Sequence, residues 1–305
     1  MKKAIRYSII LCAISWLCTA LLYFVIGVES IKDPLYVPFA SLYMLLPMLC
    51  ALVLEYFERD KTQRLKLVSF KINKHWLLAI LLPFVITSLV AIIDYYVAGV
   101  ELKTGTLMPQ EALDSLGNET MAKILSKPSN VIIFIVIQSI FAGCTLNALF
   151  AFGEEYGWRK YLVEALQDKN FVVAALFIGF VWGIWHFPMI LMGHNYGDHN
   201  IEGIFMMILF CIVLGILELY ITLKTRSVVA AAILHGTINA IAGLPSIIFN
   251  DLNPITESVP GLVGNGVMII VIALLFLYDK HISKDNIMSQ TLAQYFNSKY
   301  TSADE

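Results

Sequence analysis

Eight apolar runs, each about 20 residues long and almost free of charge, dominate this sequence. They span roughly residues 7–28, 35–57, 76–99, 131–152, 170–192, 201–223, 227–249 and 259–278. A transmembrane helix needs about 20 mainly apolar residues. Only helices and closed barrels satisfy their backbone groups in lipid, and these runs lack the alternation of barrel strands. The sequence therefore predicts an all-α, polytopic membrane protein with about eight transmembrane helices forming a bundle.

The composition supports the same class. Hydrophobic residues make up 58% of the 305 residues and charged residues 14%, whereas soluble domains carry about 25% charged residues. The net charge of −2 predicts no nucleic-acid partner, and membrane lipid is the expected surrounding. The five cysteines lie inside apolar runs, where they are typical of packing residues and not of disulfides or a thiol zinc site.

The chain begins as a signal peptide does, with basic residues followed by an apolar run. That run continues to about Val28, which is long for the apolar region of a signal peptide and predicts an uncleaved first helix. We expect a single transmembrane domain over residues 1–280. Residues 281–305 are expected to form a polar cytoplasmic tail with room for a short helix.

Lysine and arginine are distributed unevenly between the two sides of the predicted bundle. All but four of the 21 lie in the N-terminal tail, in 58–75, in 153–169, in 224–226 or after residue 279. The four on the other side are Lys32, Lys103, Lys123 and Lys127. The positive-inside rule then places both termini in the cytoplasm.

A few ionisable side chains lie at membrane depth, where they are costly and are candidate functional residues. Glu154 and Glu155 end the fourth run, His186 lies within the fifth and His235 within the seventh. If the fourth helix continues to a turn near Asn170, Glu154 and His186 each lie 16 residues from that turn. Both then sit at the same level, roughly 24 Å from it at 1.5 Å per residue.

Spacing along each helix separates the roles of these residues. Glu155 and Arg159 are four apart and can pair on one face, which predicts a structural clamp. Glu154 lies about 100° away around the helix and is left to face a cavity. His235 and Asn239 are also four apart, and their N–H groups can converge on one point as an oxyanion site requires.

These residues support hydrolysis in one of two ways. In the first, Glu154 takes a proton from a water that His186 orients, while His235 and Asn239 hold the tetrahedral oxyanion. In the second, Glu154, His186 and His235 bind a divalent metal such as zinc, with water in the open position. The sequence contains no HExxH motif and leaves both ways open.

The depth of these residues bears on access to the cavity. His235 lies about nine residues, or roughly 13 Å, from Arg226 at the predicted cytoplasmic end of its helix. Counting from Asn170 places His186 deeper. We expect the cavity to open to the cytoplasm.

Simpler interpretations stand beside these. A single His or Asn in a membrane helix is most often a hydrogen-bonded packing residue. Glu218 is expected to be solvated or ion-paired, and His194, Asp198 and His199 to be solvated residues of a short non-cytoplasmic loop. An ion-coupled transporter would show matching broken segments in inverted repeats, and the sequence shows no such pairing.

Three short patterns occur in order on three predicted helices: Glu154-Glu155-x-x-x-Arg159, Trp182-x-x-x-His186 and His235-x-x-x-Asn239. They resemble the motifs of the CPBP family of intramembrane proteases, the CAAX prenyl protease and bacteriocin-processing (Abi) family. Trp182 stands where that family has Phe, which preserves an aromatic residue. The resemblance covers the motif-bearing core, about residues 130–245.

The resemblance implies an intramembrane endopeptidase that cleaves a membrane-associated or lipidated peptide or protein. It makes Glu154 the catalytic acid and base, His186 a ligand of water or metal, and His235 and Asn239 the oxyanion donors. It implies a role in prenyl-protein maturation, peptide processing or bacteriocin self-immunity, and a bacterial cell membrane fits the chain's modest size. A non-proteolytic membrane scaffold or immunity protein of the same family is the alternative.

Overall fold

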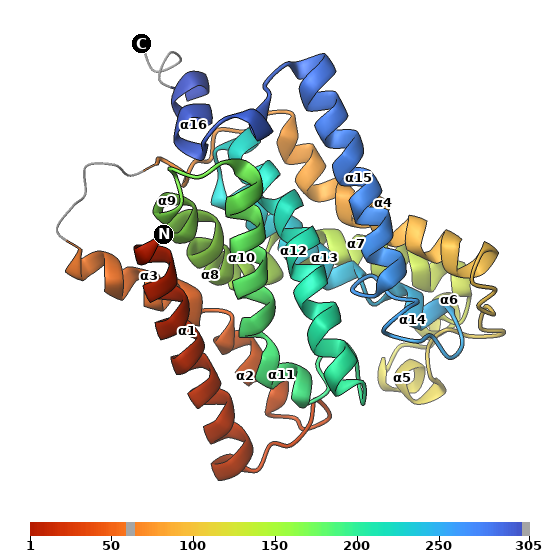
Figure 1. Ribbon diagram of the computed structural model, residues 1–305. Helices are drawn as coiled ribbons and strands as arrows, with labels where there is room; N and C mark the ends of the chain where they lie inside the picture. The colour runs from red at the N-terminus through yellow and green to blue at the C-terminus, as the bar shows by residue number, and fades with distance from the viewer. Residues whose placement is uncertain (59–64, 301–305) are drawn as a thin grey trace.

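The protein is built from helices, and its computed structural model describes residues 1–58 and 65–300 (Figure 1). Within these residues, β-type pairing is confined to two isolated bridges. The predicted all-α membrane fold is confirmed. The helices, with short π-helical (η1–η3) and 3-10 (η4) segments, are α1 (Lys2–Leu21), η1 (Leu22–Ile26), α2 (Tyr36–Tyr43), α3 (Leu46–Phe57), α4 (His75–Tyr96), α5 (Gln110–Ser115), α6 (Glu119–Leu125), α7 (Pro128–Cys144), α8 (Leu146–Glu155), η2 (Tyr156–Tyr161), α9 (Leu162–Ala165), α10 (Phe171–Trp185), α11 (Phe187–Leu191), α12 (Asn200–Thr225), α13 (Val228–Ile241), α14 (Leu244–Ile248), α15 (Leu262–Tyr278), η3 (Asp279–Ser283), η4 (Ile287–Ser289) and α16 (Leu292–Tyr300).

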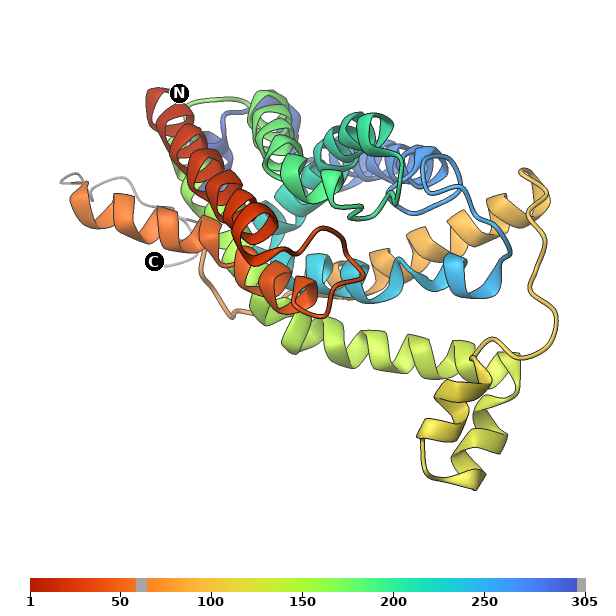
Figure 2. The same ribbon diagram turned by 90° about the horizontal axis from the view of Figure 1, so that it is seen from below.

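Most of the predicted runs form helices long enough to cross a membrane. In the described part of the chain, six stretches are both long and apolar enough: Lys2–Ile26, Tyr36–Phe57, His75–Tyr96, Ile201–Thr225, Val228–Ile248 and Leu262–Ser283. A seventh candidate joins α6 to α7, but the two helices are bent by 99°. Figure 2 shows α5 and α6 projecting beyond the end of α7. The two remaining predicted runs are 131–152, which leads to Glu154, and 170–192, which contains His186, and both are broken.

The fourth run differs from the single helix predicted over 131–152. Thr145 has a non-helical backbone (φ −125°, ψ −97°) and separates α7 from α8. Helix α13 packs across this break: a Cβ added to Gly143 would lie 2.6 Å from the Cα of Thr237. The side chain of Asn147 also donates a hydrogen bond to the carbonyl of Gly236 (3.2 Å). Contacts with a distant helix therefore override helix continuity here.

The chain beyond the break follows the prediction more closely. Helix α8 continues through η2 and α9 to Ala165, and the chain turns before α10 begins at Phe171. The fifth run then breaks at His186, between α10 and α11. Pro188 near the start of α11 explains this break, because proline cannot donate to the preceding helical turn. The break places His186 at the end of a helix and not in its middle.

The loops gather at two opposite ends of the bundle. At the first end, which we call the terminal face, the N-terminus pairs with Glu58 through Lys3 (2.7 Å). Val228 N–H donates to the carbonyl of Leu67 (2.8 Å), and Leu292 N–H donates to the carbonyl of Lys169 (3.0 Å). The terminal face thus comprises the N-terminus and the segments 65–74, 166–170, 224–228 and 279–300. It includes the described part of the predicted tail, which contains a short helix, α16 (Figure 1).

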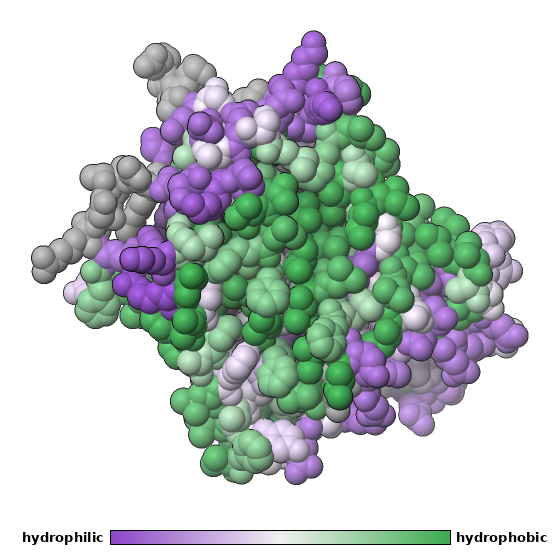
Figure 3. All heavy atoms as spheres, viewed as in Figure 1, coloured by the Kyte–Doolittle hydropathy of each residue, from purple (hydrophilic) through white to green (hydrophobic). Residues whose placement is uncertain are grey.

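At the other end, which we call the opposite face, a second set of loops meets. Ile31 N–H donates to the carbonyl of Met192 (3.2 Å), and Lys103 N–H donates to the carbonyl of Ile248 (2.9 Å). The opposite face comprises residues 28–35, 97–127, 192–199 and 249–261. Between hydrophilic regions, the surface visible in Figure 3 is mainly hydrophobic, as a bundle surrounded by lipid requires.

Helices α10 and α12 pack closely because α10 presents glycines to α12. A Cβ added to Gly179 would lie 2.5 Å from the Cα of Ile212, and one added to Gly183 would lie 2.5 Å from the Cα of Ile208. Small residues four apart allow two membrane helices to approach in this way. This packing holds the helix that ends at His186 against the centre of the bundle.

The close approach predicts a large effect for one added methyl group. We expect Gly179→Ala to lower the thermal unfolding temperature in detergent, since overpacking typically costs about 1–3 kcal/mol. The matched control is Gly266→Ala, because a Cβ at Gly266 meets no atom within 4 Å. Equal unfolding temperatures for the two variants, measured by intrinsic fluorescence, would contradict the packing described here.

Candidate active site

All four residues predicted to be catalytic line one cavity of about 490 Å³. Glu154 reaches it from α8, His186 from the junction of α10 and α11, and His235 and Asn239 from α13. The aromatic residues Tyr43, Trp182 and Trp185 form part of its wall. The structure thus brings together residues from three segments that are far apart in the sequence.

Glu154 is 2% exposed and is held by two tryptophans. Its Oε2 accepts one hydrogen bond from the Nε1–H of Trp182 (2.7 Å) and another from the Nε1–H of Trp158 (3.3 Å). Two donors on one oxygen fix the carboxylate and leave Oε1 as the atom able to exchange a proton with water in the cavity. The prediction that Glu154 faces a cavity agrees with its place in the lining.

Trp182 contributes more than the packing role that the sequence suggested. Besides donating to Glu154, its ring lies under the guanidinium of Arg159, 4.6 Å from its centroid. A phenylalanine could take part in the cation–π contact but has no N–H to donate. The signal in the sequence was the replacement of Phe by Trp within an otherwise matching motif.

His186 is oriented by the helix that it ends. Its Nδ1 lies 2.9 Å from the carbonyl of Trp182. A carbonyl oxygen only accepts, so Nδ1 carries the proton and, in the neutral ring, Nε2 is an acceptor. The ring packs edge-on against Trp185, with centroids 4.8 Å apart. His186 can therefore accept a hydrogen bond from water or bind a metal through Nε2.

His194 is a cavity residue that the sequence interpretation missed. We expected it to be solvated with Asp198 and His199. Those two are exposed, but His194 lines the cavity and stacks on His186 at a centroid distance of 6.1 Å and an interplanar angle of 13°. Its Nδ1 lies 2.9 Å from the hydroxyl of Tyr36. Burial lowers the pKa of His194 to about 4, so it is neutral at physiological pH. Only the fold places this loop against the cavity.

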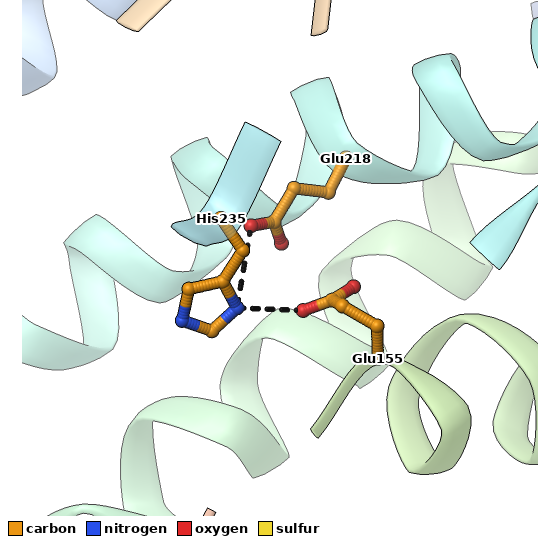
Figure 4. Close-up of side chains that lie close together, drawn as sticks. All are labelled: Glu155, Glu218 and His235. Carbon is orange, nitrogen blue, oxygen red and sulfur yellow. Dashed lines mark hydrogen bonds and ion pairs between the residues drawn. The ribbon is translucent and has the colours of Figure 1, made fainter. Parts of the chain in front are cut away.

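His235 belongs to a buried charged network. Its Nδ1 lies 2.8 Å from Oε1 of Glu155 and 3.8 Å from Oε1 of Glu218 (Figure 4). Arg159 pairs with both carboxylates; its Nε lies 3.2 Å from Oε2 of Glu155. The predicted contact between Glu155 and Arg159 is therefore present. Glu218 was expected to be either solvated or ion-paired. It is fully buried and ion-paired.

Asn239 follows His235 by one helical turn and is accessible within the cavity. Because Glu155 holds Nδ1 of His235, Nε2 is the ring atom left for the cavity. The amide of Asn239 and this ring edge can approach the same point from one helix face. The convergence of the two groups on one point, which the i,i+4 spacing predicted, stays a prediction.

Two groups of side chains are candidates for metal binding. Glu154, His186 and His235 are a suitable set in kind, since two imidazoles and a carboxylate commonly bind zinc at about 2.0–2.2 Å. Among the described residues, however, the ligand atoms that lie within 4.8 Å of one another belong to Glu155, Glu218 and His235. As the side chains stand, the predicted set is too widely spaced for joint coordination.

The second group fits a metal by spacing but not by charge. Glu155, Glu218 and His235 are buried and close enough to hold an ion. Arg159 already pairs with both carboxylates, and its positive charge would repel a divalent cation. The charged network instead orients His235. A carboxylate that binds one ring nitrogen fixes the tautomer of the imidazole and the direction in which the other ring nitrogen points.

The charged network around Arg159 predicts that the protein loses stability when one of the network's carboxylates is neutralised. Glu155→Gln leaves the buried Arg159 with one fewer partner, and breaking a buried ion pair typically costs about 3–5 kcal/mol. We expect Glu155→Gln to lower both the yield of folded protein and the unfolding temperature. Cleavage activity should fall by no more than the loss of folded protein explains. Asp168→Asn is the control, since Asp168 pairs with Lys169 at 60% exposure and exposed pairs contribute little. Full stability with complete loss of activity would instead give Glu155 the role predicted for Glu154.

Comparisons with known proteins show two similarities, and the family match covers all four predicted catalytic residues. Residues 128–241 match the family model described as type II CAAX prenyl endopeptidase Rce1-like. CAAX prenyl protease 2 of Methanococcus maripaludis is 31% identical over 141 residues, which are 44% of this chain and 49% of that protein. The chain thus aligns with about half the length of this relative. The matched residues include all four predicted catalytic residues, and the predicted family resemblance is confirmed.

Proposed function

We propose that this chain, whose residues 128–241 match the Rce1-like CAAX endopeptidase family model, is an intramembrane endopeptidase whose cavity hydrolyses a peptide bond of a membrane-associated or lipidated substrate. One observation carries the proposal. Glu154, His186, His235 and Asn239 line one cavity, and Glu154 is held there by two indole N–H donors. A fixed carboxylate beside unengaged donor and acceptor atoms is what activation of water requires.

In the first step, Glu154 acts as general base. Its Oε1 takes a proton from a water molecule while the water oxygen forms a bond to the carbonyl carbon of the substrate. Nε2 of His186 accepts the second hydrogen of that water in a hydrogen bond and so orients the attack. The carbonyl oxygen becomes an oxyanion, and no group of the protein forms a covalent bond.

The oxyanion is held by Asn239 and His235. Within the buried network, two carboxylates and one guanidinium leave one uncompensated negative charge, which an imidazolium at His235 neutralises. His235 then donates from Nδ1 to Glu155 and from Nε2 to the oxyanion, beside the amide N–H of Asn239. Protonated Glu154 finally gives its proton to the leaving amine as the C–N bond breaks. Donors aimed at such an oxyanion contribute about 10²–10³ in rate.

Glu154→Gln tests the proposal directly. The glutamine oxygen can still accept from Trp158 and Trp182, so the fold should persist, but an amide cannot take a proton from water. We expect cleavage of peptides by the reconstituted protein to fall to background while the unfolding temperature stays unchanged. The matched control is Glu111→Gln, which alters an exposed carboxylate of α5.

Unchanged cleavage by Glu154→Gln would overturn the assignment of the base. Absence of cleavage by the wild-type protein across membrane-anchored peptides would favour the non-proteolytic scaffold or immunity protein. The scaffold needs no fixed carboxylate in a cavity, and nothing in the lining favours it. We therefore place it second.

The spacing of the side chains predicts that cleavage does not depend on a metal. Because Glu154, His186 and His235 are not within joint coordination distance, we expect activity to persist within about twofold after treatment with EDTA or phenanthroline. Metal content is to be measured on the same sample by mass spectrometry. Loss of activity that is restored by one equivalent of zinc would contradict this prediction and support the three-ligand site.

A further inference from the structure

We propose that the cavity opens on the non-cytoplasmic side of the membrane, and that its substrates are uncharged, apolar peptide segments presented on that side. This deepens the proposed function by naming the class and location of the substrate, and for that part it rests on the proposed function. It reverses the expectation that the cavity opens to the cytoplasm.

The mouth of the cavity is made by loops of the opposite face. His194 and Asn195 come from the loop after α11, and Leu252 and Pro254 come from the segment before α15. Ser258 and Pro260 of the same segment also line it. Among the described residues, none of the lining comes from the segments that form the terminal face.

Hydrogen bonds tie these mouth loops to one another. The hydroxyl of Tyr196 donates to the carbonyl of Pro260 (3.1 Å), which joins the two loops. The hydroxyl of Tyr36 lies 2.9 Å from Nδ1 of His194, which joins the first loop to the start of α2. These hydrogen bonds therefore hold together the segments that surround the mouth, and these segments lie at one end of the bundle.

The other end of the cavity is closed. Below Glu154 and His235 lie Arg159 and Glu218, both 0% exposed and ion-paired with each other. Beyond them, Lys224 is buried between Asp279 and Asp285. These pairs fill the space between the cavity and the terminal face.

Charge decides which face is cytoplasmic. Lysine and arginine concentrate in the segments of the terminal face, whereas the opposite face carries Lys32, Lys103, Lys123 and Lys127. The positive-inside rule therefore places the terminal face in the cytoplasm. The cavity opens at the other end of the bundle.

The lining also limits the chemistry of the substrate. Within the described part of the chain, the lining contains no Lys or Arg and one carboxylate, Glu154, which the catalytic step uses. A free terminal carboxylate or an acidic segment would find no lysine or arginine there, and a basic segment would find only the carboxylate that the catalytic step uses. The walls are aromatic and aliphatic, with Met189, Met207 and Phe210 among them. An apolar stretch within an exported or membrane-inserted peptide fits this lining.

Cysteine labelling from one side of the membrane tests the direction. The five native cysteines are first replaced by alanine, and variants that keep wild-type unfolding temperatures are used. Leu252→Cys lies in the mouth, and Met288→Cys, 44% exposed, lies on the terminal face. A membrane-impermeant maleimide is added to intact spheroplasts and, separately, to permeabilised ones.

We expect Leu252→Cys to be labelled in intact spheroplasts and Met288→Cys only after permeabilisation. The opposite pattern, or labelling of Leu252→Cys only after permeabilisation, would overturn the proposal. Asn253→Cys, an exposed neighbour, repeats the measurement if Leu252→Cys misfolds. Labelling does not depend on cleavage, so failure of this inference is distinct from failure of the proposed function.

A second measurement tests the substrate class. Two membrane-anchored reporters carry the same apolar cleavage segment, one outside and one in the cytoplasm. We expect cleavage of the outside reporter alone, with a rate at least tenfold lower after labelling of Leu252→Cys. A third reporter with two lysines in the segment should be cleaved at least tenfold more slowly. Cleavage of the cytoplasmic reporter, or an equal cleavage rate for the reporter with two lysines, would overturn the assigned substrate class.

Discussion

A guanidinium buried between two carboxylates is the interaction on which the rest of the site depends. Arg159 is fully buried and joins Glu155 on its own helix to Glu218 on α12. Glu155 in turn holds His235 of α13. The guanidinium of Arg159 therefore links the helix that carries Glu155 to α12 directly and to α13 through Glu155. Because an unpaired ion at this depth is costly, each partner constrains the positions of the others more strictly than apolar packing alone would.

The two adjacent glutamates enter different surroundings from one helix. Glu155 is directed into the charged network, while Glu154 lines the cavity and, among the described residues, receives its hydrogen bonds from two neutral indoles. An ion pair would hold Glu154 as a carboxylate and make it a poor proton acceptor. Neutral donors fix its position without neutralising it. The division of labour follows from the 100° rotation between neighbouring residues on a helix.

The sequence predicted which residues meet but not how they are held. The equal spacing of Glu154 and His186 from the turn near Asn170 was sufficient to place both at one cavity, because helix geometry converts residue counts into depth. The pairing of Glu155 with Arg159 followed from the same geometry. The indole donors of Trp182 and Trp158 and the stacking of His194 on His186 depend on the packing of separate helices. Residue patterns within one helix carry no information on such contacts.

Both broken runs carry site residues, and this has a physical reason. Irregular backbone at membrane depth is tolerated where it is buried in protein or lines a cavity, since its free N–H and C=O groups need partners that lipid cannot supply. The break at His186 ends α10 so that the ring faces the cavity, and its backbone carbonyl still accepts from Met189 N–H (2.9 Å) and Ile190 N–H (3.0 Å). The break at Thr145 lies where α13 crosses, and the Thr145 hydroxyl donates to the carbonyl of Phe141 (2.6 Å). A hydropathy pattern alone predicts continuous helices at these positions, because the breaks are stabilised by tertiary contacts that surround the cavity.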